Sequence, residues 1–559
     1  MRHLSPFQKF LVILFLIAVF FSAWNQLKES DSFYHLKVGQ AIWETKSVPH
    51  ADIFSSTARG VPWVTHEWLA ELLFYGIYAA GGFAGLAAFV AGLAVLTYFV
   101  VILTAIRGIS PPAGGRANVY VALAVAAALG AFTFALWIPR PQVFAFFACA
   151  LLLFFLEGFR RERRVRMLIG AVGTIWFWAN VHASVLLGIV LILLYALVEI
   201  AKLKWSALGE SMPREALRRL AAAAGAAVAA AFVNPNSYDI FLYRLYVTEG
   251  VEQLGILEWK SIFNFLYQWQ TAVFLALLVF SLAVVIWWRS RRAARDATPI
   301  VILAAVAILP LLSIRHMGWW PLAAAAPAAI ALSGAGEGFL RRASQRFLRR
   351  AFFAGLAVWL IFGIVNLPEG LVQRRTLPVG VADFILANDI RGPIFNLYNE
   401  GGYLIWRLWP RELVFVDGRS EVFGGEPFAD LIRIVKRGRG WEAAFFGKYG
   451  VNAAILPYVP ASLARDTAPL SFELVRRGFR LVHWDDVAML LVRETLGNRE
   501  FVNQYAFQSI HPLRDPRTIP PEEAKRAGIE IQALLARAPE SRNVQQYAKR
   551  FLQNRSINE

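Results

Sequence analysis

Residues 31–37 read Asp-Ser-Phe-Tyr-His-Leu-Lys, so acidic, aromatic, imidazole and basic side chains follow one another closely. If residues 32–44 form a helix, Asp31 and His35 are one helical turn apart and lie on the same face. A carboxylate held there could take a proton from an acceptor hydroxyl or ligate a metal ion. The simpler role for Asp31 is that of a helix N-cap, which does not exclude chemistry.

A second group of reactive side chains follows at residues 65–68, Thr-His-Glu-Trp, which adds His66 and Glu67. His35 and Glu67 are therefore predicted catalytic residues beside Asp31. Asp31, Asp52 and His66 are the predicted ligands of a divalent cation, Mg²⁺ or Mn²⁺. The spacing of these residues matches no compact metal-binding motif, so a site without a metal is the alternative.

The elements that must position these residues are predicted to be membrane helices. Of the 559 residues, 57% are hydrophobic and 17% are charged, whereas an ordinary soluble protein has about 25% charged residues. This composition argues against a soluble enzyme, a disordered chain and a coiled coil, and the single cysteine, Cys149, excludes an intramolecular disulfide. Because a spanning helix needs about 20 mostly apolar residues, the sequence predicts about eleven spans. They are 7–25, 82–106, 117–137, 142–158, 167–179, 184–201, 219–233, 271–288, 298–313, 318–335 and 351–366.

The positions of the basic residues predict how these helices are oriented. A net charge of +18 would suit a nucleic-acid-binding protein, but the Lys and Arg residues are concentrated in alternate loops. By the positive-inside rule those loops and the N-terminus are cytoplasmic, the C-terminus is outside, and no nucleic-acid partner is expected. A signal peptide is the less favoured interpretation of the first apolar run, because that run is long. The clusters are Arg160, Arg161, Arg163, Arg164 and Arg166; Lys202, Lys204, Arg214, Arg218 and Arg219; Arg289, Arg291, Arg292 and Arg295; and Arg341, Arg342, Arg346, Arg349 and Arg350.

The sequence therefore predicts a polytopic α-helical membrane protein with a C-terminal extracytoplasmic α/β domain. Within the transmembrane domain, 1–366, residues 26–81 form a long first outer loop, and 63–78 are typical of an amphipathic interfacial helix. Short β-branched runs at 393–395, 413–416, 453–456 and 488–492, with a helical pattern at 427–437, predict the α/β domain, 367–515. Residues 516–559 are predicted to be a polar helical tail.

Polar residues near membrane depth are costly and are functional candidates. In this topology those outside the basic clusters all lie at outer ends of spans or in outer loops. Outer loops must contain some polar residues. In the short loops 137–142, 180–182 and 314–316, however, the polar residues lie close in sequence to Trp or Pro. As a set they indicate an outward-facing site at the membrane boundary. They are Asp31, His35, Asp52, His66, Glu67, Arg140, Gln142, Asn180, His182, Asn234, Asn236, Arg315 and His316.

This architecture resembles the GT-C superfamily, glycosyltransferases that use polyprenyl-phosphate-linked sugars. The stretch 31–37 is similar to the Asp-x-aromatic-aromatic-His-x-basic stretch of archaeal and eukaryotic oligosaccharyltransferase catalytic subunits. Residues 398–405 and 415–419 resemble the Trp-Trp-Asp-x-Gly-Tyr-x-Ile and Val-Asp-Asn segments of those subunits, although a Gly-rich turn would also explain them. Tyr-Asn-Glu at 398–400 replaces the Trp-Trp-Asp that contacts the acceptor sequon, so recognition of a peptide sequon is not expected.

The resemblance implies displacement at a sugar C1 with a lipid phosphate or pyrophosphate as the leaving group. Asp31 would deprotonate the acceptor, and Arg315 would stabilise the phosphate through its planar guanidinium. Arg315 could instead be an interfacial arginine that extends its side chain to the membrane surface. The predicted substrate-binding residues are Arg315, His316, Arg140, His182, Glu400 and Tyr403.

The partners implied are a polyprenyl-phosphate-linked sugar donor, membrane lipids, and an acceptor that is a protein, a lipid or a glycan. The predicted location is the inner (plasma) membrane of a bacterium or archaeon. Two other functions stay open, a glycolipid flippase and a non-catalytic component of envelope assembly. A flippase would need charged groups at mid-depth, and the predicted spans are nearly free of charge.

Overall fold

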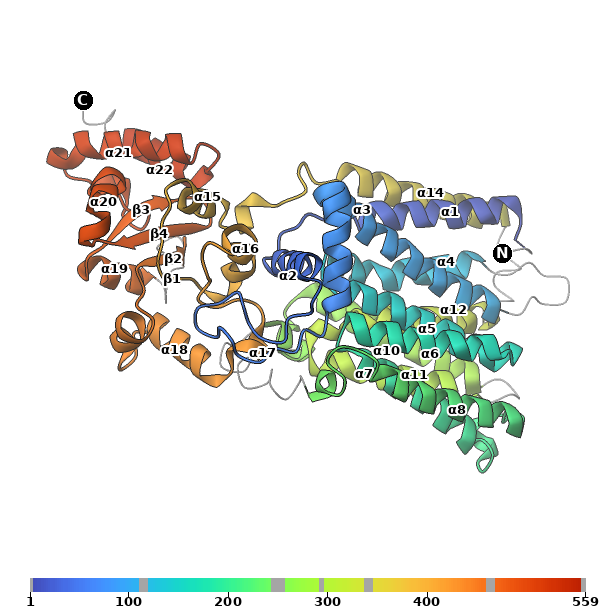
Figure 1. Ribbon diagram of the computed structural model, residues 1–559. Helices are drawn as coiled ribbons and strands as arrows, with labels where there is room; N and C mark the ends of the chain where they lie inside the picture. Colours follow the sequence, from blue (N-terminus) through green and yellow to red (C-terminus); the bar gives the residue numbers. More distant parts are fainter. Residues whose placement is uncertain are drawn as a thin grey trace.

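The computed structural model describes residues 4–109, 119–242, 257–290, 296–335, 345–458 and 468–553. Apolar helices run side by side in a bundle, and the small sheet with its helices lies at one end of that bundle (Figure 1). The N-terminus lies at the opposite end of the bundle, and the C-terminus lies at the far side of the sheet-containing part (Figure 1). The mostly helical class with a small sheet is thus confirmed.

Each predicted span coincides with a helix of the bundle. In the part of the chain that the structure describes, four helical segments are long and apolar enough to cross a membrane, and six further apolar helical stretches are shorter, including residues 352–365 of α14. The number of spans therefore stays a prediction. The bundle helices are α1 (Pro6–Ser22), α3 (Trp68–Gly108), α4 (Val119–Gly130), α5 (Gln142–Glu162), α6 (Val165–Val181), α7 (Val185–Ala201), α8 (Arg214–Ala231), α10 (Trp269–Ser290), α11 (Thr298–Leu312), α12 (Trp319–Ala335) and α14 (Gln345–Val365).

Helix α3 consists of two parts that meet at Gly82, whose φ of 60° suits glycine better than any other residue. The part before Gly82 lies across the end of the bundle, as an interfacial helix would (Figure 1). It begins at Trp68, several residues later than the sequence predicts. Helix α2 (Asp31–Thr45) packs against this part of α3, and the predicted helix at 32–44 is confirmed.

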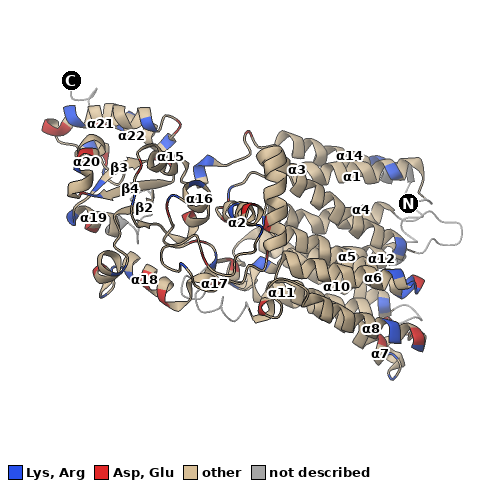
Figure 2. Cartoon of the chain, in the orientation of Figure 1, with Lys and Arg blue, Asp and Glu red and all other residues tan. Residues whose placement is uncertain are grey.

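The charged residues of the bundle gather at its end away from the sheet-containing part, and few lie along its middle (Figure 2). The helix ends that carry the predicted basic clusters, such as those of α5, α7 and α8, lie there. Opposite ends for the basic loops and the C-terminal part are what the N-in, C-out topology requires, and the orientation itself stays a prediction. Arg291, Arg292, Arg295, Arg341 and Arg342 lie outside the described residues.

The C-terminal part contains a four-stranded sheet in the order β1-β2-β4-β3. β1 pairs with β2 in parallel, and the pairs β2·β4 and β3·β4 are antiparallel. The strands are β1 (Ile394–Phe395), β2 (Ala453–Pro457), β3 (Phe479–Trp484) and β4 (Ala488–Arg493), with helices α15 (Val379–Ala387), α16 (Tyr398–Leu408), α17 (Ser420–Phe423), α18 (Gly425–Val435), α19 (Ala468–Arg476) and α20 (Arg499–Tyr505).

One predicted strand is wrong and one strand was missed. The run 413–416 is not part of the sheet, because Val414 forms an isolated parallel bridge with Ser55 of the first outer loop. Strand β3 escaped prediction because Arg480 and His483 interrupt its apolar pattern. The predicted strands at 393–395, 453–456 and 488–492 correspond to β1, β2 and β4, and the helix at 427–437 corresponds to α18.

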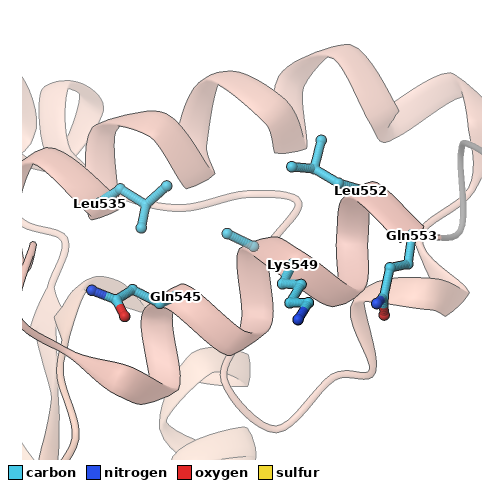
Figure 3. A pocket seen from close by; sticks show the side chains of 6 residues that line it. Leu535, Gln545, Lys549, Leu552 and Gln553 are labelled. Atoms are coloured by element: carbon cyan, nitrogen blue, oxygen red, sulfur yellow. The ribbon is translucent and has the colours of Figure 1, made fainter.

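The polar tail forms the predicted helices, α21 (Ala524–Arg537) and α22 (Arg542–Gln553). A shallow pocket between them is lined mainly by the side chains shown in Figure 3. It lies at the far side of the C-terminal part, remote from the predicted site residues (Figure 1). The lining residues are Leu535, Gln545, Ala548, Lys549, Leu552 and Gln553.

Candidate functional site

Asp31 begins α2, at the level where the bundle meets the C-terminal part. The N-cap position of α2 is occupied by Ser30, which makes no side-chain capping hydrogen bond, and Asp31 is the first residue of the helix. The Asp31 carboxylate instead pairs with the guanidinium of Arg140. Arg140 Nε also lies 3.0 Å from Glu29 Oε2, and its Nη1 lies 3.8 Å from Glu258 Oε2. The Arg140 guanidinium therefore interacts with three carboxylates.

The loop between α4 and α5 holds Arg140 in this position. The amide of Asn25, just beyond α1, donates hydrogen bonds to the carbonyl oxygens of Phe134 (2.8 Å) and Trp137 (3.1 Å). The end of the first helix thereby fixes the loop beside residues 29–31. Burial raises the pKa of Asp31, and the positive charge of Arg140 opposes this increase.

The C-terminal part closes over Asp31 through two glycine-containing segments. The backbone N–H of Tyr403 donates to Ser30 Oγ at 2.7 Å, and the Tyr398 hydroxyl donates to the carbonyl of Gly418 at 2.9 Å. A Cβ on Gly418 would lie 2.2 Å from Asp31 Oδ1, so only glycine permits this approach. The segments around 398–405 and 415–419 therefore meet at Asp31.

Asp52, a predicted metal ligand, has a different set of partners. Its carboxylate accepts hydrogen bonds from the backbone N–H groups of Phe54 and Ser55, and it lies 2.7 Å from Arg419 Nη1. Arg419 also binds Asp417 through two of its nitrogens, at 2.8 and 2.6 Å. These buried residues join the first outer loop to the C-terminal part, so Asp52 is engaged in a structural ion pair.

A cluster of imidazoles and carboxylates lies between α2 and the start of α3. His35 Nδ1 lies 2.9 Å from Glu71 Oε1 and 3.7 Å from Glu67 Oε2. On the other oxygen of Glu67, His182 Nε2 lies at 3.4 Å and His66 Nε2 at 3.6 Å. We call these five residues, His35, His66, Glu67, Glu71 and His182, the His–Glu cluster.

The charge states within the His–Glu cluster follow from burial and from the imidazoles around Glu67. Burial lowers the pKa of His35 to about 3 and that of His182 to about 4, so both are neutral at pH 7. Burial acts to raise the pKa of Glu67, but the neighbouring imidazoles, His66 above all, outweigh it and hold that pKa well below its usual value. Glu67 is therefore an anion among imidazoles.

The residues that could hold a metal ion differ from the predicted set. Among the described residues, one group of His and acidic side chains has all its ligand atoms within 4.8 Å of one another, namely His35, Glu67 and Glu71. The predicted set of Asp31, Asp52 and His66 does not form such a group. The sequence prediction missed Glu71, although it lies one helical turn after Glu67 in α3 and its spacing could have revealed it.

Short outer loops bring further predicted residues to the same region. Asn180 accepts a hydrogen bond from Trp68 Nε1 at 3.1 Å, and Asn236 donates to the carbonyl of Thr65 at 3.0 Å. These contacts hold the start of α3, and with it Glu67, against the bundle. The structure thus brings Asn180 and Asn236 to the segment that carries Glu67.

Arg315 is connected to Arg140 by Glu258, an acidic residue that the sequence prediction missed. Arg315 Nη1 lies 3.6 Å from Glu258 Oε1, and its guanidinium lies 5.1 Å from the Trp259 ring centre. Glu258 thus lies between Arg315 and Arg140. His316 is in the same 3₁₀ turn as Arg315, Ile314–His316. Glu29 and Glu258 lacked a motif in the sequence, and the fold alone reveals them.

The two predicted substrate-binding residues of α16 are both buried. Tyr403 packs its ring against Phe33 of α2, with centres 5.0 Å apart, and its hydroxyl accepts a hydrogen bond from Arg407. Burial raises the pKa of Glu400 to about 7, and its Oε2 has no hydrogen-bond partner among the described residues. Tyr403 therefore joins α16 to α2, and Glu400 is partly protonated near neutral pH.

No protein-family model matches the chain, and no curated protein matches it either. Solved structures do match its fold. The oligosaccharyltransferase AglB from Archaeoglobus fulgidus, in complex with an inhibitory peptide and a dolichol-phosphate, aligns with a TM-score of 0.53 at 14% identity, over 81% of this chain and 70% of AglB. The apo form of an oligosaccharyltransferase from the same organism aligns with a TM-score of 0.53 at 13% identity, over 91% and 76%.

ArnT from Cupriavidus metallidurans, bound to undecaprenyl phosphate, aligns with a TM-score of 0.51 at 14% identity, over 88% of this chain and 98% of ArnT. These proteins are GT-C glycosyltransferases that use polyprenyl-phosphate-linked donors, and the resemblance of the chain to the GT-C superfamily is confirmed. At this level of identity, the likeness establishes the fold and leaves the activity to be argued from the site.

Proposed function

We propose that this chain is a polyprenyl-phosphate-dependent membrane glycosyltransferase that transfers a sugar or glycan to an acceptor at the outer face of the membrane. The observation that carries the proposal is the position of Asp31. Its carboxylate lies beside an arginine, at the end of the bundle that the C-terminal part covers. In the proposed orientation this end faces outward, where a lipid headgroup would lie.

The proposed reaction is a displacement at the sugar C1. Asp31 takes the proton of the acceptor hydroxyl, whose oxygen forms the new bond to C1. The bond between C1 and the phosphate oxygen breaks, and the leaving phosphate keeps the electron pair. Arg315 and Arg140 stabilise that charge, because guanidinium groups bind phosphate through paired donors and stay ionised.

The donor and the acceptor are proposed by class. AglB and ArnT were solved with dolichol-phosphate and undecaprenyl phosphate, which supports a polyprenyl-phosphate-linked donor here. The acceptor is a protein, a lipid or a glycan, and Tyr-Asn-Glu at 398–400 argues against a peptide sequon. A divalent cation, which the sequence suggests, has no step in this scheme, because the arginines stabilise the phosphate.

The test is the Asp31→Asn variant of the full chain in lipid nanodiscs, supplied with radiolabelled polyprenyl-phosphate sugars and an envelope extract as acceptor source. Loss of a general base lowers turnover by roughly 10²–10⁴-fold, with folding unchanged by gel filtration and thermal unfolding. The matched control is Asp389→Asn, an exposed ion-paired aspartate of the C-terminal part, which should keep wild-type turnover. Wild-type turnover in Asp31→Asn would remove Asp31 as the base. No turnover of any donor by the wild type would favour an assembly component or a flippase.

A further inference from the structure

The His–Glu cluster is separate from the Asp31–Arg140 pair, and the proposed transfer uses none of its members as a reacting group. Its central residues come from two elements: His35 lies in α2, Glu67 is the N-cap residue of α3, and Glu71 lies in the first turn of α3. Their ligand atoms lie within 4.8 Å of one another, a distance that one metal ion could bridge. They are almost fully enclosed, since His35 is 3% and Glu71 is 1% exposed.

One oxygen in this cluster lacks a partner. Glu71 Oε1 approaches His35, but Glu71 Oε2 is buried and has no hydrogen-bond partner among the described residues. Burying a carboxylate oxygen without a donor is costly, and buried acidic groups are normally paired or bind metal ions. The partnerless oxygen therefore points to a ligand of positive charge.

The backbone around the cluster is closely packed. A Cβ on Gly39 would lie 2.0 Å from the carbonyl oxygen of Glu71, so α2 and α3 touch directly at this point. Trp68 is held by Asn180, which fixes the first turn of α3. Ligands carried on two helices in direct contact are held in a defined geometry, which a metal site requires.

We propose that His35, Glu67 and Glu71 bind one transition-metal ion of the Zn²⁺ class. A set of one imidazole and two carboxylates suits Zn²⁺ and similar ions, whereas Mg²⁺ prefers oxygen ligands and retains its waters. His66 and His182 lie against the other oxygen of Glu67 and orient it, as second partners of ligating carboxylates do. This assignment replaces the predicted set of Asp31, Asp52 and His66 and the predicted ions.

The ion would act on the transfer by positioning. His35 is one helical turn from Asp31 in α2, so fixing His35 to α3 fixes the direction in which Asp31 projects. The effect on Asp31 rests on the proposed function, but binding of the ion does not. Metal binding can therefore be measured without any sugar donor. A negative result for metal binding would leave the proposed glycosyl transfer untouched, and the reverse also holds.

The first measurement is metal content and affinity of the purified full-length chain in nanodiscs. After stripping with a chelator, Zn²⁺ is returned in competition with a chromophoric indicator. We expect one tightly bound Zn²⁺ per chain, which a large excess of Mg²⁺ does not displace. Because changing even a second partner of a ligand costs about 10–100-fold in affinity, Glu71→Gln and His35→Ala should each weaken binding by more than about tenfold.

The matched controls are His50→Ala and Glu44→Gln, which change an exposed histidine and an exposed glutamate outside the cluster. Both should bind Zn²⁺ as the wild type does. Co²⁺ bound to the wild-type chain provides a readout that needs no variant, because its visible d–d absorption reports nitrogen and oxygen ligands in a low-symmetry site.

A wild-type chain that binds no Zn²⁺ and gives no such Co²⁺ spectrum would overturn the proposal. Equal affinity in the wild type and a folded Glu71→Gln variant would also overturn it, because the ion would then lie elsewhere. Ready displacement of Zn²⁺ by Mg²⁺ would contradict the assigned class of metal. If His35→Ala fails to fold, two measurements still test the proposal. They are the Zn²⁺ affinity of Glu71→Gln, which keeps the shape of the side chain, and the Co²⁺ spectrum of the wild type.

Discussion

Arg140 is the residue on which the charge at the proposed site depends. It pairs with Asp31 and Glu29 and approaches Glu258, which Arg315 approaches from the other side. A phosphate group would compete with Glu258 for the two arginines, because each guanidinium has a limited number of N–H donors. Glu258 is 40% exposed in its side chain and can move aside more easily than a buried residue.

This competition predicts opposite effects for two substitutions on the binding of polyprenyl phosphate. Arg315→Gln should weaken binding by about 10–100-fold, because a hydrogen bond to a charged group contributes about 1.5–3 kcal/mol. Glu258→Gln should strengthen binding, because it removes the competing charge. Binding to the protein in nanodiscs can be measured by native mass spectrometry. Arg218→Gln, in the basic cluster at the other end of the bundle, is the control and should leave affinity unchanged.

Glu400 predicts a pH dependence of stability. Its pKa is about 7 in the folded chain against an ordinary value of 4.5, so between these values the folded chain holds a proton that the unfolded chain has released. Stability should therefore fall as the pH rises from about 4.5 to about 7, by at most about 3 kcal/mol. Thermal unfolding of Glu400→Gln at pH 5 and pH 8 should lack this decrease. An identical decrease in wild type and variant would contradict a buried Glu400, and Glu540→Gln serves as the exposed control.

At the scale of elements, α2 connects the bundle to the C-terminal part. It contacts the start of α3 through Gly39 and contacts α16 through Phe33 and Tyr403. Lys37 adds a cation–π contact with Trp406 of α16, 4.9 Å from the ring centre. The helix that carries Asp31 is thus held on both sides, and small shifts of either neighbour would move the carboxylate.

Gly418→Ala tests this arrangement. The added methyl group would meet Asp31 Oδ1 at 2.2 Å and push the carboxylate away. A misplacement of about 1 Å can cost about 10²-fold in rate, so we expect a loss of turnover of that order with little loss of stability. Gly447→Ala is the control, because its added methyl group would meet no atom within 4 Å. Equal turnover in both variants would contradict close contact between the C-terminal part and Asp31.

The helices were largely predictable because their apolar runs have the length and composition of bundle helices. Helix α2 was also predictable, and with it the proximity of Asp31 and His35. The segment 413–416 was not, because its apolar residues suit a strand, and the contact with Ser55 depends on a loop far away in the sequence. The partners of Asp52 could not be predicted for the same reason. Nor could Glu29 and Glu258, because only the fold brings these acidic residues close to Arg140.

At the scale of the whole molecule, the proposed site depends on the orientation in the membrane. The charged helix ends and the C-terminal part lie at opposite ends of the bundle (Figure 2). If the basic loops are cytoplasmic, the His–Glu cluster and Asp31 both lie near the outer surface. Donor sugars would then have to reach the outer leaflet before transfer.

Cysteine labelling tests the orientation, because the native Cys149 is buried and does not compete. In spheroplasts, an impermeant maleimide should label Gln545→Cys, in the exposed face of α22, without permeabilisation. It should label Arg164→Cys, between α5 and α6, only after the membrane is permeabilised. The reverse pattern would contradict the N-in, C-out topology and would place the proposed site in the cytoplasm.

The central claim is that a lipid phosphate binds beside Asp31. A cryo-electron microscopy structure of the full chain in nanodiscs with a polyprenyl phosphate would test it most directly. We predict phosphate density within hydrogen-bond distance of the Arg315 or Arg140 guanidinium, with Glu258 turned away and the Asp31 carboxylate facing the phosphate. Phosphate density at the basic end of the bundle, with Arg140 and Arg315 still paired with Glu258, would contradict it.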